Sequence, residues 1–152
     1  MTNRTASGLL ILLASFSSST LAAEAPGKHP YYLHALSDLR SAYSLIQHRP
    51  GDMATNGRES IALKEISDAV DDIRKGAIDD GRNMNDHPPT DTSSDHSGAL
   101  HEAAELLQKA QDDVGKDEDD KAAKGLQQRS LQHIARARSA IEEAISDVQE
   151  KR

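Results

Sequence analysis

Apolar residues recur along this chain with the spacing of α-helices. Between about His29 and Gln47 they follow one another at steps of four and three residues, which places them on one side of a helix. Three further segments, over about residues 58–79, 97–114 and 121–149, show the same period. The residues predicted to line the interior are Tyr32, Leu36, Leu39, Tyr43 and Ile46, then Ala62, Ile66, Ala69, Ile73 and Gly76, then Leu100, Ala103, Leu107, Ala110 and Val114, and finally Ile134, Ala137, Ile141, Ala144 and Val148.

The mean spacing predicts how these helices pack. A period near 3.5 residues favours neighbours that cross at shallow angles. The apolar residues available are mainly Leu, Ile, Val and Ala, whereas sheets favour aromatic and β-branched residues. We therefore predict an all-α protein, an antiparallel four-helix bundle with its helices in up-down-up-down order.

The connections between the predicted helices are unequal. Residues 80–96, rich in Asp, Asn, Pro and Ser, separate the second helix from the third. This connection is longer than the roughly 2–8 residues usual in bundles. The first two helices also resemble the last two at an offset of 67 or 68 residues, as when Leu63 and Ile66 match Leu131 and Ile134. The pattern has two interpretations, a duplicated helical hairpin or the chance alignment of amphipathic helices.

The first residues have the order of a secretory signal. Before the first acidic residue, Glu24, come the basic Arg4, an apolar run over residues 8–16, and small residues that end in Ala23. The apolar run is shorter than the roughly 20 residues that span a bilayer. We predict cleavage after Ala23, with cleavage after Ala25 and retention as a membrane anchor as the alternatives.

This interpretation sets the expected domains and location. Residues 1–23 form the signal peptide and residues 24–152 form one helical domain, which is periplasmic or secreted and has no stable membrane span after cleavage. The chain has a formal net charge of −7, which disfavours nucleic acid and anionic lipid as partners. It contains no cysteine, which excludes disulfides, a cysteine nucleophile and covalently attached haem.

Seven histidines offer the most distinctive metal-binding chemistry. No two have the i, i+3 or i, i+4 spacing with which one helix presents two rings to one ion. A site would have to be assembled from separate segments, and His34, His87 and His133 are the candidate ligands. His133, next to the predicted interior residue Ile134, is the best placed to face the boundary between two helices. The alternative for each histidine is a surface side chain.

Other charged clusters are interpreted more simply. The acidic pair Asp71 and Asp72, and the acidic run over residues 112–120, are predicted to be solvated faces or turns rather than acid–base pairs. Neither a Gly-x-Ser-x-Gly sequence nor a glycine-rich phosphate loop occurs. We therefore predict a protein that is not an enzyme.

Two strings of the sequence carry a resemblance. Residues 29–40 read His-Pro-Tyr-Tyr-Leu-His-Ala-Leu-Ser-Asp-Leu-Arg, and residues 79–89 read Asp-Asp-Gly-Arg-Asn-Met-Asn-Asp-His-Pro-Pro. Together they resemble a group of uncharacterised small exported bacterial helical-bundle proteins. The resemblance implies a helical domain and export, and it brings no catalytic or binding residues with it. The positions that it singles out for testing are Tyr32, His34, Asp38, Arg40, Asp86 and His87.

Three functions are compatible with these observations. The first is an exported, non-enzymatic bundle that binds an unidentified protein or small ligand. The second is a bundle that binds a metal ion or haem, for which His133 with Met53 or Met84 would supply axial ligands. The third is a hydrolytic enzyme that uses His87 and the carboxylates of the long connection.

Overall fold

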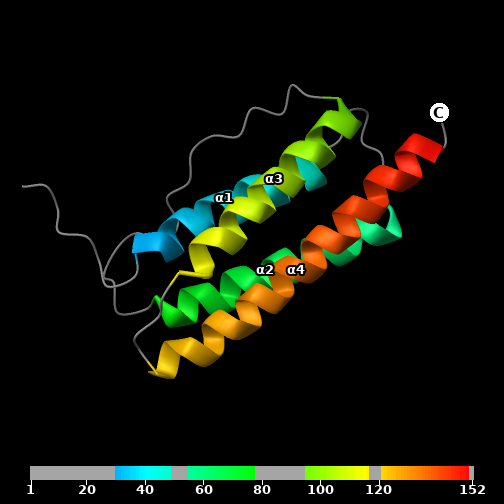
Figure 1. Ribbon diagram of the computed structural model, residues 1–152. Helices are drawn as coiled ribbons and strands as arrows, with labels where there is room; N and C mark the ends of the chain where they lie inside the picture. Colours follow the sequence, from blue (N-terminus) through cyan, green and yellow to red (C-terminus); the bar gives the residue numbers. More distant parts are fainter. Residues whose placement is uncertain (1–29, 49–54, 78–94, 117–120, 151–152) are drawn as a thin grey trace, which may run out of the picture.

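The computed structural model describes residues 30–48, 55–77, 95–116 and 121–150, and within them it consists of four α-helices and no strand (Figure 1). The helices are α1 (Pro30–Gln47), α2 (Gly57–Gly76), α3 (His96–Val114) and α4 (Lys121–Glu150). These bounds lie within three residues of the predicted ones, and the all-α class is confirmed. The predicted signal peptide lies outside the described residues.

The predicted interior residues form the core. All of them are buried except Tyr43 and Val148, which pack against the core from its edge, and Gly76, which is partly exposed. Each large buried aliphatic side chain contributes about 1.5–3 kcal/mol by leaving water. Alanines are interspersed with larger residues among the buried side chains of every helix. At Gly76, an added Cβ would lie 3.4 Å from the ring of Tyr32.

The first turn of α2 is fixed by side chains that cap it. The Asn56 side chain accepts a hydrogen bond of 2.8 Å from the backbone N–H of Glu59, and the Glu59 carboxylate accepts one of 2.9 Å from the backbone N–H of Asn56. The Glu59 side chain is completely buried, and its Oε1 lies 3.1 Å from Nε2 of His96 at the start of α3. The first turns of α2 and α3 therefore lie at the same end of the bundle.

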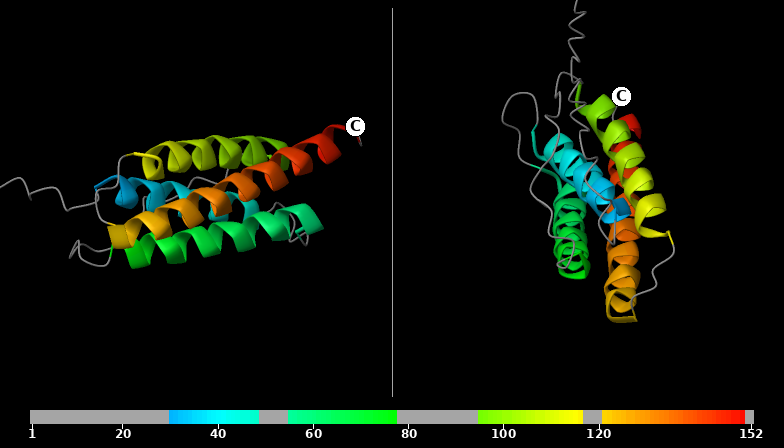
Figure 2. Two further views of the ribbon diagram at one scale, coloured as in Figure 1. Left: turned by 60° about the horizontal axis from the view of Figure 1, so that its bottom comes forward. Right: turned by 90° about the vertical axis from the view of Figure 1, so that its left-hand side faces the viewer.

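The helix order differs from the prediction. α1 runs antiparallel to α2 and α3, and α4 also runs antiparallel to both, so that α2 and α3 are parallel and sit diagonally (Figures 1 and 2). The contacts that fix these directions are Tyr31 with Lys116, Arg58 with Asp147, and Gln127 with the carbonyl of Val114. The bundle is antiparallel between neighbours, as predicted, but its order is up-down-down-up, and the predicted up-down-up-down order is wrong.

This order explains the long connection. α2 ends and α3 begins at opposite ends of the bundle, so the chain between them has to cover the length of a helix (Figure 1). A helix the length of α2 measures about 30 Å, and residues 77–95 can reach roughly 60 Å when extended. A crossover of this kind needs many more residues than a turn between adjacent helices. The predicted helix order was wrong because the length of this connection was not recognised as a requirement of the topology.

The two hairpins are arranged with approximate two-fold symmetry. A two-fold axis perpendicular to the bundle would relate α1 to α3 and α2 to α4. These are the two helix pairs with the most extensive contacts (Figures 1 and 2). Residues near such an axis contact their own counterparts. Glu65 and His133, which are 68 positions apart, lie 2.7 Å from each other. This arrangement is compatible with both interpretations of the repeat, a duplicated hairpin and the chance alignment of amphipathic helices.

Candidate functional site

Ion pairs run along the boundary between α2 and α4. The α2 residues in these pairs are Arg58, Glu65 and Asp72, which are spaced seven residues apart. We call these residues and their partners on α4 the ion-pair row: Arg58 Nε lies 2.7 Å from Asp147 Oδ2 and also contacts Glu143, Arg136 Nε lies 2.9 Å from Glu65 Oε2, and Arg129 Nε lies 3.0 Å from Asp72 Oδ2.

The order of charges in the ion-pair row specifies how the two helices align. Along α2 the signs are positive, negative, negative, and along α4, at residues 129, 136 and 143, they are positive, positive, negative. The antiparallel alignment makes every facing pair opposite in sign, whereas a parallel one would bring like charges together twice. Charges flanking a helix boundary select orientation in this way in coiled coils.

Asp72 corrects the interpretation of the acidic pair as a solvated face. Asp71 is exposed, but Asp72 is 7% exposed and turned towards α4. Its carboxylate pairs with Arg129 and also lies 3.7 Å from Lys75 Nζ. Burial of a carboxylate is tolerated when hydrogen-bonding cations accompany it.

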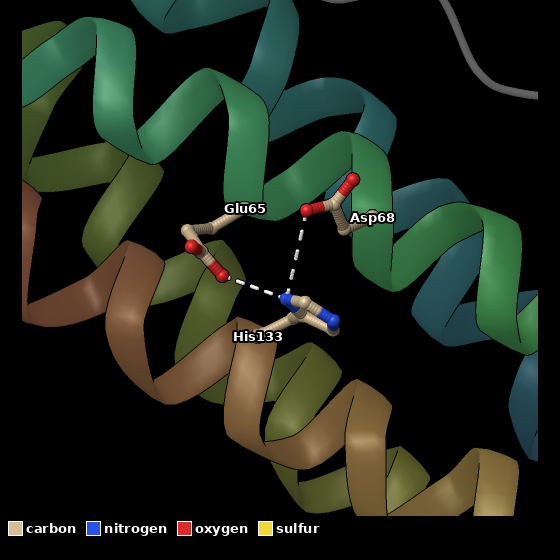
Figure 3. Close-up of side chains that lie close together, drawn as sticks. All are labelled: Glu65, Asp68 and His133. Atoms are coloured by element: carbon tan, nitrogen blue, oxygen red, sulfur yellow. Dashed lines mark hydrogen bonds and ion pairs between the residues drawn. The ribbon is translucent and has the colours of Figure 1, made fainter.

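At the middle of the ion-pair row, a histidine and a second carboxylate join the pair (Figure 3). Glu65 and Asp68 are neighbours on one face of α2, and His133 reaches them from α4. His133 Nδ1 lies 2.7 Å from Glu65 Oε2 and 3.9 Å from Asp68 Oδ2. One ligand atom from each of the three residues lies within 4.8 Å of the others. The expectation that His133 faces a helix boundary is confirmed, and we call these three residues the donor cluster.

Two cations accompany the donor cluster. Arg136 binds Glu65, and Lys64 Nζ lies 2.6 Å from Asp68 Oδ2. Burial alone would raise the pKa of Glu65, but hydrogen bonds from His133 and Arg136 outweigh it and hold that pKa below its ordinary value. The hydrogen bond from Lys64 likewise lowers the pKa of Asp68. Both carboxylates are therefore ionised at neutral pH.

The ring of His133 makes two contacts that one nitrogen cannot satisfy together. Nδ1 lies 2.7 Å from a carboxylate oxygen of Glu65, which requires that Nδ1 donate a proton. It also lies 2.8 Å from Nη2 of Arg136, a donor, which requires a lone pair on Nδ1. Because an imidazole nitrogen carries either a proton or a lone pair, one of the two contacts is unfavourable in each tautomer.

The metal ligands predicted from the sequence do not come together. His34 is exposed on α1, which lies diagonally across the bundle from the helix that carries His133. His87 and Asp86 lie outside the described residues, as do the methionines considered as haem ligands. The sequence reasoning missed Glu65 and Asp68 as neighbours of His133.

His34 and Asp38 line a wide, open hollow between α1 and α3. Its volume is about 420 Å³, and its other described lining residues are Ser37, Lys109, Asp112 and Asp113. Partial burial raises the pKa of Asp38; the charge of Asp113 also raises it, while Lys109 and His34 lower it. This carboxylate is therefore less well compensated than Glu65.

A second hollow lies between α1 and α2, the adjacent helices with the least extensive contact. We call it the α1–α2 groove; its volume is about 370 Å³, and it is lined by Arg40, Tyr43, Ser44, Gln47, Ile66, Ser67 and Val70. Burial lowers the pKa of Arg40, and the nearby charge of Arg74 lowers it further. Of the positions singled out by the resemblance, Arg40 lines this groove, whereas Tyr32 is a core residue.

A serine and a histidine meet at the edge of the α1–α2 groove. Ser44 Oγ lies 3.3 Å from His48 Nδ1, the distance of a nucleophile and its base. The same Nδ1 lies 2.9 Å from the backbone carbonyl oxygen of Ser44, which can only accept a hydrogen bond. Nδ1 therefore carries the proton in this arrangement and cannot take one from the hydroxyl. The pair is a local helix contact rather than an activated nucleophile.

None of the described helices is both long enough and apolar enough to cross a membrane. Comparison with known proteins finds no match to the chain among family models, curated proteins or solved structures. The resemblance to small exported bacterial proteins therefore stays a prediction.

Proposed function

We propose that this chain is an exported, non-enzymatic binding protein, that the α1–α2 groove is its binding site, and that its ligand is a small amphipathic anion. The observation that carries the proposal is the composition of the groove, which combines an apolar floor with one guanidinium group. Export rests on the order of residues at the start of the sequence.

The groove has the size and surface that a small ligand requires. Its volume of about 370 Å³ falls within the roughly 300–1,000 Å³ of small-molecule sites. Val70 from α2 and the ring of Tyr43 from α1 offer apolar surface, while Ile66, which also lines the groove, is itself fully buried. Ser44 and Gln47 provide hydroxyl and amide groups that can orient a ligand by hydrogen bonds.

The charge expected of the ligand follows from Arg40. Its lowered pKa reflects a partly desolvated site with a second guanidinium group, that of Arg74, nearby. A negative charge bound in the groove would be attracted by the guanidinium group of Arg40, which lines it. Because the chain as a whole is acidic, this attraction is local, and the apolar part of the ligand has to contribute the rest of the affinity.

A fluorescent probe tests the site. Anilinonaphthalene sulfonate has an aromatic body and one negative charge, and we expect the folded protein to bind it with increased emission. Ser44→Trp, which fills the groove, should abolish the emission, and Arg40→Gln should weaken binding about tenfold, as loss of a charge-assisted hydrogen bond predicts. Ser139→Trp, an equal enlargement at an exposed site on α4, is the matched control and should bind as the unchanged protein does.

Two results would contradict the proposed site. One is equal binding by the Ser44→Trp variant and the Ser139→Trp control. The other is the absence of any probe binding by a protein whose circular dichroism spectrum shows that its helices are formed.

Export is tested separately. Expression of the whole chain in a bacterium, followed by fractionation and mass analysis, should give a periplasmic protein that begins at Glu24. A cytoplasmic protein that retains residues 1–23 would remove export from the proposal and leave the groove unaffected.

A further inference from the structure

We propose that Glu65, Asp68 and His133 form a binding site for one divalent transition-metal ion of the zinc class. The site is separate from the α1–α2 groove and does not depend on the proposed function. It uses a different ligand set from the one that the histidines alone suggested.

The distances within the donor cluster suit such an ion. A tetrahedral ion with bonds of about 2.1 Å separates its ligand atoms by roughly 3.4 Å. His133 Nδ1 lies 2.7 Å from Glu65 Oε2 and 3.9 Å from Asp68 Oδ2, on either side of that value. Small rotations of the three side chains would equalise the distances. Figure 3 shows the ring and both carboxylates directed towards one another.

The chemistry of the donors narrows the choice of ion. One imidazole nitrogen and two carboxylate oxygens suit borderline divalent ions better than the all-oxygen ions calcium and magnesium. Three protein ligands would leave the fourth position of a tetrahedral ion to water. The three side chains are between 15% and 36% exposed, so an ion can reach them from solvent.

The cations near the donor cluster can leave it. The side chains of Lys64 and Arg136 are 71% and 52% exposed, so either can swing into water without opening the core. Their departure leaves two carboxylates for a doubly charged ion to neutralise. Lys64 and Arg136 are therefore competitors of the ion rather than part of its site.

An ion would also resolve the conflicting contacts of His133. In the structure, Nδ1 faces both an acceptor on Glu65 and a donor on Arg136. A metal ion can bind the lone pair of Nδ1 and the carboxylate of Glu65 at the same time. No position of the Nδ1 proton satisfies both of the contacts that this nitrogen makes now.

The helices hold the donor cluster in place. Glu65 and Asp68 lie within α2, and His133 lies within α4, far from the ends of both helices. On either side, the pairs of Arg58 with Asp147 and of Arg129 with Asp72 tie the two helices together. Donors carried by helices fixed in this way need little reorganisation to bind an ion.

The test measures zinc binding by the purified chain at neutral pH. Competition with a chromophoric chelator should give one saturable ion per chain, and cobalt should give the visible absorption of a protein-bound, low-coordinate ion. His133→Ala and Glu65→Gln should each lower the zinc affinity at least tenfold. His101→Ala is the matched control, because His101 is exposed on α3, the helix diagonally opposite α2, and this variant should bind zinc unchanged.

A variant that strengthens binding separates this site from loss of folding. Lys64→Ala removes the cation that holds Asp68 and should raise the zinc affinity several-fold, a gain that unfolding could not produce. The proposal is overturned by equal affinities of His133→Ala and the unchanged chain, by unchanged or weaker binding in Lys64→Ala, or by the absence of saturable binding at 100 µM zinc. None of these outcomes bears on the probe experiment with the α1–α2 groove.

Discussion

The pairs α2–α4 and α1–α3 occupy equivalent places in the approximate two-fold arrangement, yet they handle charge differently. The ion-pair row crosses the boundary of α2 and α4 at three levels. Between α1 and α3, the polar contacts of the described residues include Lys116 over the ring of Tyr31, at 3.8 Å, and Asp38 in an open hollow with Lys109.

The two pairs show that backbone geometry does not determine electrostatic compensation. Glu65 and Asp38 are both partly buried carboxylates, each at a boundary between antiparallel helices. Hydrogen bonds lower the pKa of the first, whereas burial raises the pKa of the second. We infer that charge specifies the alignment of α2 with α4, while apolar packing predominates between α1 and α3.

The largest expected effect comes from reversing one charge in the ion-pair row. Arg129→Glu would place a second carboxylate beside the buried Asp72, and the free energy of unfolding should fall more than for any other substitution described here. Lys109→Glu makes the equivalent change beside Asp38 and should cost less than about 1 kcal/mol, because that hollow is open to water. Urea unfolding monitored by circular dichroism measures both.

The comparison depends on the difference between these two variants. Adding Asp72→Asn to Arg129→Glu should recover most of the loss, because it removes one of the two repelling charges. Equal losses in Arg129→Glu and Lys109→Glu would show that the two helix pairs do not differ in the way described.

A smaller effect concerns the stability of the protein at low pH. Because folding lowers the pKa of Glu65 from 4.5, this residue stabilises the protein above that pH, and its contribution disappears as the pH falls through the folded value. Glu65→Gln should therefore lose about 1–2 kcal/mol at pH 7 and little at pH 2. Thermal unfolding at a series of pH values measures the difference.

Asp38 provides the opposite case and serves as the control. Folding raises its pKa from 3.8, so its favourable contribution exists below that pH and is lost as the pH rises through the folded value. Asp38→Asn should stabilise the protein at pH 7, by less than about 1 kcal/mol, and have no effect at pH 2. A loss of stability at pH 7 would contradict the assignment of Asp38 as a carboxylate whose burial is incompletely compensated.

The core could be predicted from the sequence because one periodic property determines it. Residues such as Leu36, Ile66, Leu107 and Ile141 were identified from spacing alone, and all are buried. Helix order could not be predicted in the same way, since the same stripes close around a core in either topology. Only the length of residues 77–95 distinguishes the two, because a chain that returns along the bundle needs that length.

The candidate site was predicted only in part. The position of His133 beside Ile134 correctly placed it at a helix boundary, but its partners come from another helix, and their identity depends on the register between α2 and α4. The charges spaced seven residues apart on both helices contain that register. Aligning them in antiparallel order brings Glu65 opposite Arg136, one turn from His133. Arg40 was singled out only by the resemblance, and nothing in the spacing indicated the α1–α2 groove.

The length of the crossover between α2 and α3 also determines whether the two hairpins that pack together come from one chain or from two. Because residues 77–95 are long enough to span the bundle, both hairpins of one chain can meet. A deletion that left the crossover shorter than α2 would prevent this while leaving each hairpin intact. The halves would then exchange between two copies, and the product would be a domain-swapped dimer that keeps every contact of the monomer.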